Sequence, residues 1–264
     1  MYNFQYHKPQ SVADAVKAIG GKEDAKLLAG GMTLIPTLKQ RLAKPSDLID
    51  LGKIAELKGI KREGNAVVIG AMTRHAEVAA SDVVKGAIPA LAHLAEGIGD
   101  PQVRNRGTIG GSIANNDPAA DYPSAVLALN ATVITNKRRI AADDFFKGMF
   151  ETALGPDEII TAVSFPIPEK AGYSKFPNPA SRYAVVGVLV AKSGSGVRVA
   201  VTGAAPCVFR QKDMEAALGK SWSADAVANI KQSANGLNAD IHASAEYRAH
   251  LVTVMAKRAV QAAG

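Results

Sequence analysis

Two glycine pairs are the residues of this 264-residue chain whose types and spacing could do chemistry. They lie in Ala29-Gly30-Gly31-Met32-Thr33 and in Thr108-Ile109-Gly110-Gly111-Ser112, each beside hydroxyl residues. Glycine lets backbone N–H groups approach an anion closely and permits positive φ. Where such a loop leads into a helix, unpaired N–H donors and the helix dipole favour a phosphate. One loop could hold one phosphate, and two facing loops could clamp a pyrophosphate.

A structural interpretation of the same loops stays open. The chain has 24 glycines, so pairs at ordinary turns are expected by chance. Neither loop matches the Gly-x-Gly-x-x-Gly fingerprint of dinucleotide-binding domains or the phosphate loop that ends in Gly-Lys-Ser/Thr. The motifs therefore favour an anion site and do not name its ligand.

The first glycine pair lies between a strand pattern and a helix pattern. An apolar run at 26–28 leads into the pair, a helix is expected over 34–42, and a strand over 47–51. Before them, Ser11 can cap a helix that ends at Gly20, with Asp14 three residues on. This β-loop-α-β order is typical of an α/β unit.

The second glycine pair lies in a longer segment of mixed patterns. A hairpin is expected around 63–65, and Thr73 is expected to cap a short helix. The remaining expected elements are a helix at 88–95, a loop-rich stretch at 97–112, a helix at 122–129, and strands at 131–135 and 159–165.

A proline-rich stretch precedes the last third of the chain. Residues 166–179 contain four prolines, which predicts a linker between domains. Beyond it, 184–191 and 197–204 form an antiparallel hairpin pattern, and helical patterns finish the chain. We therefore expect a division of the chain near this stretch, with a smaller C-terminal part of hairpin and helices.

Composition excludes several kinds of site. With Cys207 as its single cysteine, the chain cannot ligate a four-thiolate iron–sulfur cluster, build a four-cysteine zinc site or form an internal disulfide. The five histidines show no metal-ligand spacing, so no metal site is expected. The net charge of +7 suits an anionic cofactor or an acidic partner. With 14 aromatic residues and no recognition motif, nucleic-acid binding is not expected.

Targeting signals are not evident either. The N-terminus lacks a basic region followed by an apolar stretch, and no run approaches the ~18 apolar residues of a spanning helix. We expect a soluble, cytoplasmic protein without a membrane span.

The glycine loops and their surroundings resemble a known family. The segments 28–36 and 104–115, continued by 117–123, 157–160 and 181–187, look like the FAD-binding subunit of molybdenum hydroxylases. The similarity is greatest to the medium subunit of the aerobic carbon monoxide dehydrogenase family, and xanthine dehydrogenases carry a related flavin domain. It extends in order over nearly the whole chain.

The resemblance implies a fold and a set of FAD-binding residues. The fold would be an α+β fold of the vanillyl-alcohol-oxidase type. It would have two α/β FAD-binding subdomains at 1–55 and 56–168, and a C-terminal α+β domain of antiparallel sheet and helices at 172–264. The two loops would bind the pyrophosphate, with Met32, which departs from the small or polar residue often found there, contributing only its backbone. Further cofactor contacts would come from Asn115, Asp121, Ile160, Lys175 and Tyr183, and no residue is expected to be catalytic.

For several of these residues a structural role stays open. Asp121 could cap the following helix, and with Asp117 it has the spacing of a carboxylate pair, although an Asp-Pro turn and a helix cap explain both. Lys175 could be a solvated linker lysine, and Tyr183 could pack in a core at a strand start.

The resemblance also implies a function and partners. A large molybdenum subunit would oxidise the substrate, a small iron–sulfur subunit would carry the electrons, and FAD here would pass them to an external acceptor. A dimer of heterotrimers is the family expectation. The alternatives are a free-standing FAD-dependent oxidoreductase of the same fold type, and a flavin-free nucleotide-binding or assembly protein.

Overall fold

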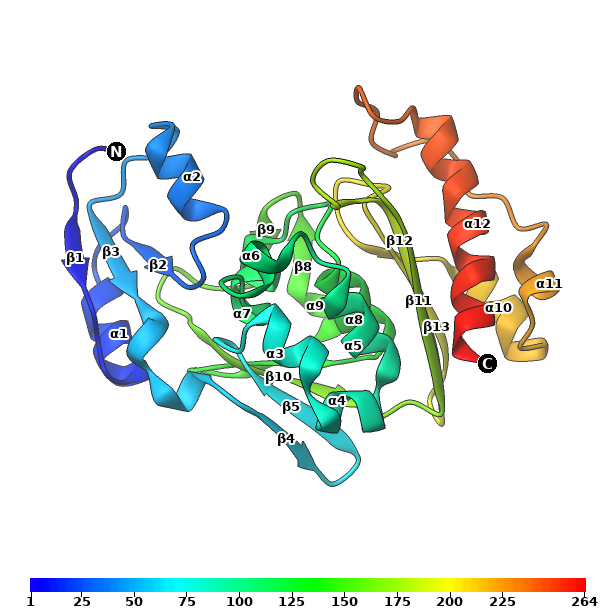
Figure 1. The fold of residues 1–264 in the computed structure, drawn as a ribbon, viewed down its shortest axis with the longest axis horizontal. Coiled ribbons are helices and arrows are strands. Elements are labelled where there is room, and N and C mark those ends of the chain that lie inside the picture. The colour runs from blue at the N-terminus through cyan, green and yellow to red at the C-terminus, as the bar shows by residue number, and fades with distance from the viewer.

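A computed structural model describes residues 1–264 and contains three main sheets in chain order. The first is a three-stranded parallel sheet of order β1-β3-β2. Its elements are β1 (Gln5–His7), α1 (Val12–Ile19), β2 (Lys26–Leu28), α2 (Leu34–Lys39) and β3 (Asp47–Asp50), followed by two 3₁₀ turns at Leu51–Lys53 and Ala55–Leu57. These elements form the blue end of the ribbon (Figure 1).

The second sheet is a five-stranded antiparallel sheet of order β4-β5-β10-β6-β7. The strands are β4 (Ile60–Glu63), β5 (Ala66–Gly70), β6 (Thr132–Thr135), β7 (Arg139–Ala141) and β10 (Ile160–Pro166). Helices connect β5 to β6: α3 (His75–Ala80), α4 (Asp82–Ala87), α5 (Pro89–Glu96), α6 (Pro101–Arg104), α7 (Ile109–Asn115) and α8 (Tyr122–Ala128). A short helix α9 (Ala142–Phe145) leads to a small hairpin of β8 (Phe146–Gly148) and β9 (Glu151–Thr152).

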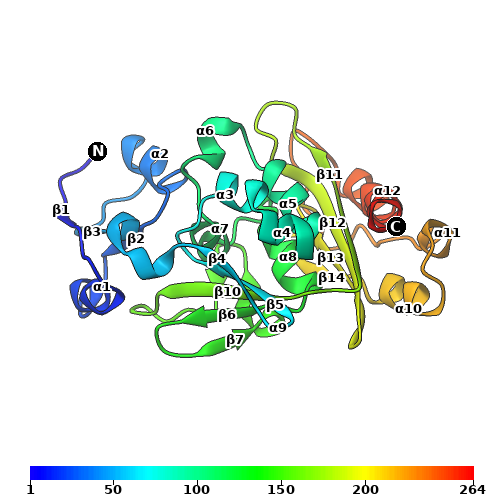
Figure 2. The ribbon, with the colours of Figure 1, turned by 60° about the horizontal axis from the view of Figure 1, so that its bottom comes forward.

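The third sheet is antiparallel, of order β11-β12-β13-β14. It comprises β11 (Lys170–Pro177), β12 (Ala184–Ser193), β13 (Gly196–Thr202) and β14 (Phe209–Arg210). The helices α10 (Lys212–Lys220), α11 (Ala224–Val227) and α12 (Ala245–Ala263) cover one face, while α5 and α8 lie against the other (Figures 1 and 2). Because both faces are covered, β12 is buried over eight consecutive residues, Ala184 to Ala191.

The expected α+β class, with mixed and antiparallel sheets, is confirmed. The predictions that rested on helix caps and hairpin turns are confirmed in the following cases. Ser11 caps α1 by accepting the Asp14 N–H at 3.1 Å, and both expected hairpins form. No helix is long and apolar enough to cross a membrane.

The linker prediction for 166–179 was wrong. Residues 170–177 form β11, and only residues 167–169 separate it from β10. The prolines misled because Pro166 and Pro177 are the last residues of their strands, and β11 lies at an edge of its sheet, where proline is tolerated. The predicted start of the last domain, residue 172, falls inside this strand.

Two smaller expectations also differ, and short strands such as β1 were not expected. Thr73 does not cap a helix, because its hydroxyl hydrogen-bonds Gly59, and Arg74 precedes α3 instead. The expected helix at 34–42 ends at Lys39, since Arg41 is left-handed (φ 59°) and the Leu42 N–H turns back to the Thr37 carbonyl. The three-residue strand β1 carried too short a pattern to be expected.

Candidate functional site

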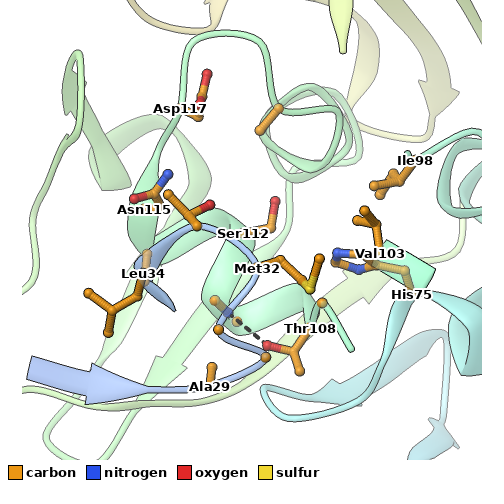
Figure 3. A pocket seen from close by; sticks show the side chains of 18 of the residues that line it. Ala29, Met32, Leu34, His75, Ile98, Val103, Thr108, Ser112, Asn115 and Asp117 are labelled. Carbon is orange, nitrogen blue, oxygen red and sulfur yellow. Dashed lines mark hydrogen bonds between the residues drawn. The ribbon is translucent and has the colours of Figure 1, made fainter. Parts of the chain in front are cut away.

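A cavity of about 770 Å³ lies where the two glycine loops meet, within the size range of cofactor sites. Thirteen of the fourteen residues predicted from the sequence to bind the cofactor line it. They are Ala29, Gly30, Gly31, Met32, Thr33, Thr108, Gly110, Gly111, Ser112, Asn115, Asp121, Ile160 and Tyr183. Figure 3 shows side chains from both loops around the same space. Lys175 does not line the cavity.

The first loop presents free backbone donors. Five consecutive N–H groups, from Gly30 to Leu34, have no acceptor within the chain. Gly31 has a φ of +75°, a left-handed conformation that glycine adopts at little cost. The loop continues into α2, which has only six residues, so the N–H groups rather than a long helix dipole make this part of the wall suitable for an anion.

The second loop differs, because most of its donors are used within the protein. Thr108 caps α7, and its hydroxyl accepts the Gly111 N–H at 3.2 Å. The Ile109 and Gly110 N–H groups donate to the carbonyls of Thr73 and Ala71, and that of Ser112 to Thr108. The expectation that both loops present free N–H groups is therefore met by the first loop only.

Side chains supply the free polar groups near the second loop. The Ser112 hydroxyl and the Asn115 amide line the cavity without a hydrogen bond to the protein, and Figure 3 shows both beside the first loop. These two groups can donate to and accept from a ligand that the first loop holds.

Two of the glycines also allow close packing, Gly30 of the first loop against the segment before the second loop, and Gly110 of the second loop against the residue that follows β5. A Cβ on Gly30 would lie 2.2 Å from the Arg106 carbonyl oxygen, and one on Gly110 would lie 2.6 Å from the Ala71 Cβ. Such contacts exclude any side chain at either position. From the sequence, both glycines were explained by the close approach of a ligand to the backbone. The two distances show instead that both positions must be glycine for the chain to pack this closely.

Asp121 lines the cavity and is held in a buried cluster with Tyr173 and Lys175, which lie behind the wall. The Asp121 carboxylate accepts the Tyr173 hydroxyl at 2.5 Å and faces the Lys175 ammonium at 2.8 Å, and the ion-paired side chains are 3% and 9% exposed. Burial raises the pKa of Asp121 above its ordinary value, while the Lys175 charge opposes that shift. Lys175 also donates to the carbonyls of Gly97 and Arg182, so it links three segments around the cavity.

These contacts decide between the interpretations that the sequence left open. The Asp121 side chain makes no helix-cap bond, and Lys175 is not a solvated linker lysine. Asp117 accepts the Ala119 N–H at 2.9 Å in the expected Asp-Pro turn. Tyr183 is 45% exposed and lines the cavity, so it is not a core residue.

Several polar residues in the cavity wall were not predicted as site residues, Glu158 and His75 among them. Glu158 accepts from Arg138, Gly155 and Thr135, and the Arg138 hydrogen bond lowers the Glu158 pKa to about 2. His75 is 5% exposed and makes no side-chain hydrogen bond. No motif spacing marks His75 in the sequence, so only the fold reveals it.

The wall suits FAD. Near the two loops the cavity wall presents neutral hydrogen-bond donors. Apolar residues from two hydrophobic core clusters flank this region, and Leu27, Leu51 and Ile159 come from the first of these clusters. Ile98 and Ile160 belong to the second cluster. A dinucleotide needs this combination, because its pyrophosphate is polar and the rings at its two ends are largely apolar.

Two family models match the chain. The FAD binding domain in molybdopterin dehydrogenase matches residues 2–168, and the CO dehydrogenase flavoprotein C-terminal domain matches residues 171–263. The carbon monoxide dehydrogenase medium chain of Hydrogenophaga pseudoflava is 38% identical and covers 98% of this chain and 96% of its own length. The nicotine 6-hydroxylase medium subunit of Paenarthrobacter nicotinovorans is 38% identical over 98% and 97%.

Solved structures agree with these matches. The carbon monoxide dehydrogenase of Hydrogenophaga pseudoflava superposes with a TM-score of 0.89 at 39% identity, covering 99% of this chain and 97% of the other. Quinoline 2-oxidoreductase from Pseudomonas putida 86 gives a TM-score of 0.90 at 29% identity, covering 99% and 96%. The family that the sequence resembles is thus confirmed, and the chain belongs to the FAD-binding medium subunits of molybdenum hydroxylases, as the carbon monoxide dehydrogenase medium chains do.

Proposed function

We propose that this chain holds FAD in the cavity between its glycine loops and serves as the electron-transfer subunit of a molybdenum-containing hydroxylase or dehydrogenase. The observation that carries the proposal is the row of five N–H groups, Gly30 to Leu34, that have no acceptor in the chain and line a cavity of cofactor size.

The chain's own residues would bind and orient the cofactor. The first loop would donate its N–H groups to the pyrophosphate, with Ser112 and Asn115 adding side-chain hydrogen bonds. Tyr183 would shelter the flavin ring from water, and the Asp121–Lys175 pair would keep the wall beside it in place. When bound, FAD supplies a redox centre that takes up electrons from a donor and releases them to an acceptor.

The partners in this proposal are a large molybdenum subunit and a small iron–sulfur subunit, assembled as a dimer of heterotrimers in the cytoplasm. The cysteine content supports the division of labour. Cys207 alone cannot ligate a cluster, so the clusters that deliver electrons must sit on another chain. The carbon monoxide dehydrogenase medium chain and the nicotine 6-hydroxylase medium subunit are named as parts of such larger enzymes.

The test is an absorbance spectrum of the protein purified at native levels, together with identification of the chains that copurify. We expect flavin bands and two partner chains that carry molybdopterin and iron–sulfur centres. A yellow, solitary chain that turns over a substrate would instead establish a free-standing oxidoreductase. A complex without flavin that also fails to take up added FAD would leave a nucleotide-binding or assembly protein.

A further inference from the structure

His75 places a buried imidazole without a hydrogen-bond partner in the cavity wall. It is the first residue of α3, and its main-chain N–H donates to the Gly107 carbonyl at 3.0 Å, directly before the second glycine loop. The side chain is 5% exposed and lines the cavity, and Nδ1 is fully buried with no partner. Nε2 has no partner in the chain either.

Packing holds the ring in this position. The ring lies 5.3 Å from that of Tyr122, centroid to centroid, at an angle of 49°. On another side it touches Gly107, where an added Cβ would lie 2.5 Å from Nε2. Figure 3 shows the ring pointing into the space beside Met32 and Val103. Its orientation is therefore set by neighbours that make no hydrogen bond to it.

The imidazole is uncharged near neutral pH. Burial and the nearby Arg104 charge lower the His75 pKa to about 4. A neutral imidazole carries one N–H donor and one acceptor nitrogen, and both lack a partner here. Buried polar atoms without a partner are rare because they destabilise the fold. Nε2, unlike Nδ1, keeps access to the cavity, so a ligand hydrogen bond to Nε2 would offset part of the cost of burying this ring.

We infer that His75 is a hydrogen-bond partner of the flavin bound in this cavity, a role that rests on the proposed function. A flavin nucleotide offers carbonyl oxygens and ring nitrogens that accept from a neutral imidazole, and hydroxyl and imide groups that donate to it. His75 thus joins the first loop, Ser112 and Asn115 as a contact that neither glycine motif contains.

The test replaces the imidazole while keeping the ring packing. His75→Phe retains a planar ring against Tyr122 and removes both nitrogens. His75→Asn restores a polar group near the position of Nδ1, and His75→Gln restores one near Nε2. The matched control is His93→Phe, since His93 is exposed on the neighbouring helix α5 and does not line the cavity.

The protein is purified with the subunits that accompany it, stripped of flavin and titrated with FAD, with binding followed by flavin fluorescence. We expect His75→Phe to weaken FAD binding about tenfold and to alter the absorbance bands of the bound flavin. At least one of the two amide variants should recover most of the affinity, and His93→Phe should match the wild type. A circular dichroism spectrum and a melting curve identify any variant that does not fold.

The possible failures are distinguishable. Wild-type protein that takes up no FAD overturns the proposed function. Wild-type protein that binds FAD, with a folded His75→Phe of equal affinity and an unchanged flavin spectrum, overturns this inference alone. A folded His75→Phe with reduced affinity that neither amide improves also overturns it, because ring packing rather than a hydrogen bond would then explain the loss.

Discussion

Gly30 lies against the main chain of Arg106, so that a Cβ on Gly30 would stand 2.2 Å from the Arg106 carbonyl oxygen and 2.8 Å from the Gly107 Cα. The two residues are 76 positions apart in the sequence and belong to the segments that carry the two glycine loops. Their contact shows how the loops come to line one cavity. A glycine in the first loop removes the side chain that would hold the loops apart.

Gly30→Ala should therefore disturb both the fold and the cavity. The Cβ meets backbone atoms, which cannot rotate away, so we expect a loss of about 1–3 kcal/mol in the free energy of unfolding. FAD binding should weaken as well, because the loops must separate. Gly86→Ala is the control, since Gly86 is exposed on α4 with no atom within 4 Å of its added Cβ. That variant should be neutral or slightly stabilised in urea unfolding, and equal effects of the two changes would contradict the argument.

Lys175→Met should be strongly destabilising. It leaves the Asp121 carboxylate buried without its charge partner and removes the donor from the carbonyls of Gly97 and Arg182. Breaking one side of a buried pair typically costs about 3–5 kcal/mol. Lys137→Met provides the contrast, because the Lys137–Asp157 pair is exposed and its loss should leave the melting temperature almost unchanged. A Lys175→Met protein as stable as the wild type would refute the buried-pair assignment.

Stability should fall between pH 7 and pH 4.5 through His75. Its pKa is about 4 in the folded chain, where burial and the Arg104 charge disfavour the charged form, and 6.5 in the unfolded chain. The unfolded state therefore takes up the proton first, and the contribution of His75 is complete above pH 6.5 and lost as the pH falls toward 4. Urea unfolding should show wild type losing about 2 kcal/mol more than His75→Phe over this interval.

The interval from pH 7 to pH 4.5 lies above the pH range in which the strongly paired carboxylates of the folded chain take up protons. Hydrogen bonds from Lys22 and from Arg138 lower the pKa values of Asp47 and Glu158, respectively, to about 2, so their contributions are lost only at lower pH. Identical pH dependence of wild type and His75→Phe would show that the histidine is not held uncharged.

Met32 and Ser112 should respond differently to truncation. If Met32 contributes only its N–H, Met32→Ala should change the FAD dissociation constant by less than about threefold. Ser112→Ala removes a free hydroxyl in the cavity wall and should weaken binding about tenfold. Fluorescence titration measures both, and a large loss in Met32→Ala would show that the thioether itself contacts the cofactor.

Local sequence signals predicted much of the fold because their causes are local. The Ser11 cap and the two hairpin turns depend on a few neighbouring residues, and all three form as expected. The proline-rich stretch misled for the opposite reason. Proline lacks an N–H, which excludes it from a central ladder, but only the strand order shows that β11 lies at an edge. The domain boundaries inferred from that stretch stay a prediction.

The sequence by itself determined the family, through its resemblance in several segments, and thirteen of the residues that line the cavity. It also determined caps and turns, because glycine, hydroxyl and cap residues carry their conformational preferences with them. Only the tertiary structure decided which donors are free. The N–H groups of Ile109 and Gly110 donate to the carbonyls of Thr73 and Ala71. The Lys175 ammonium pairs with Asp121 and donates to two main-chain carbonyls. His75 became a site residue in the same way, since a missing partner is a property of everything packed around a side chain.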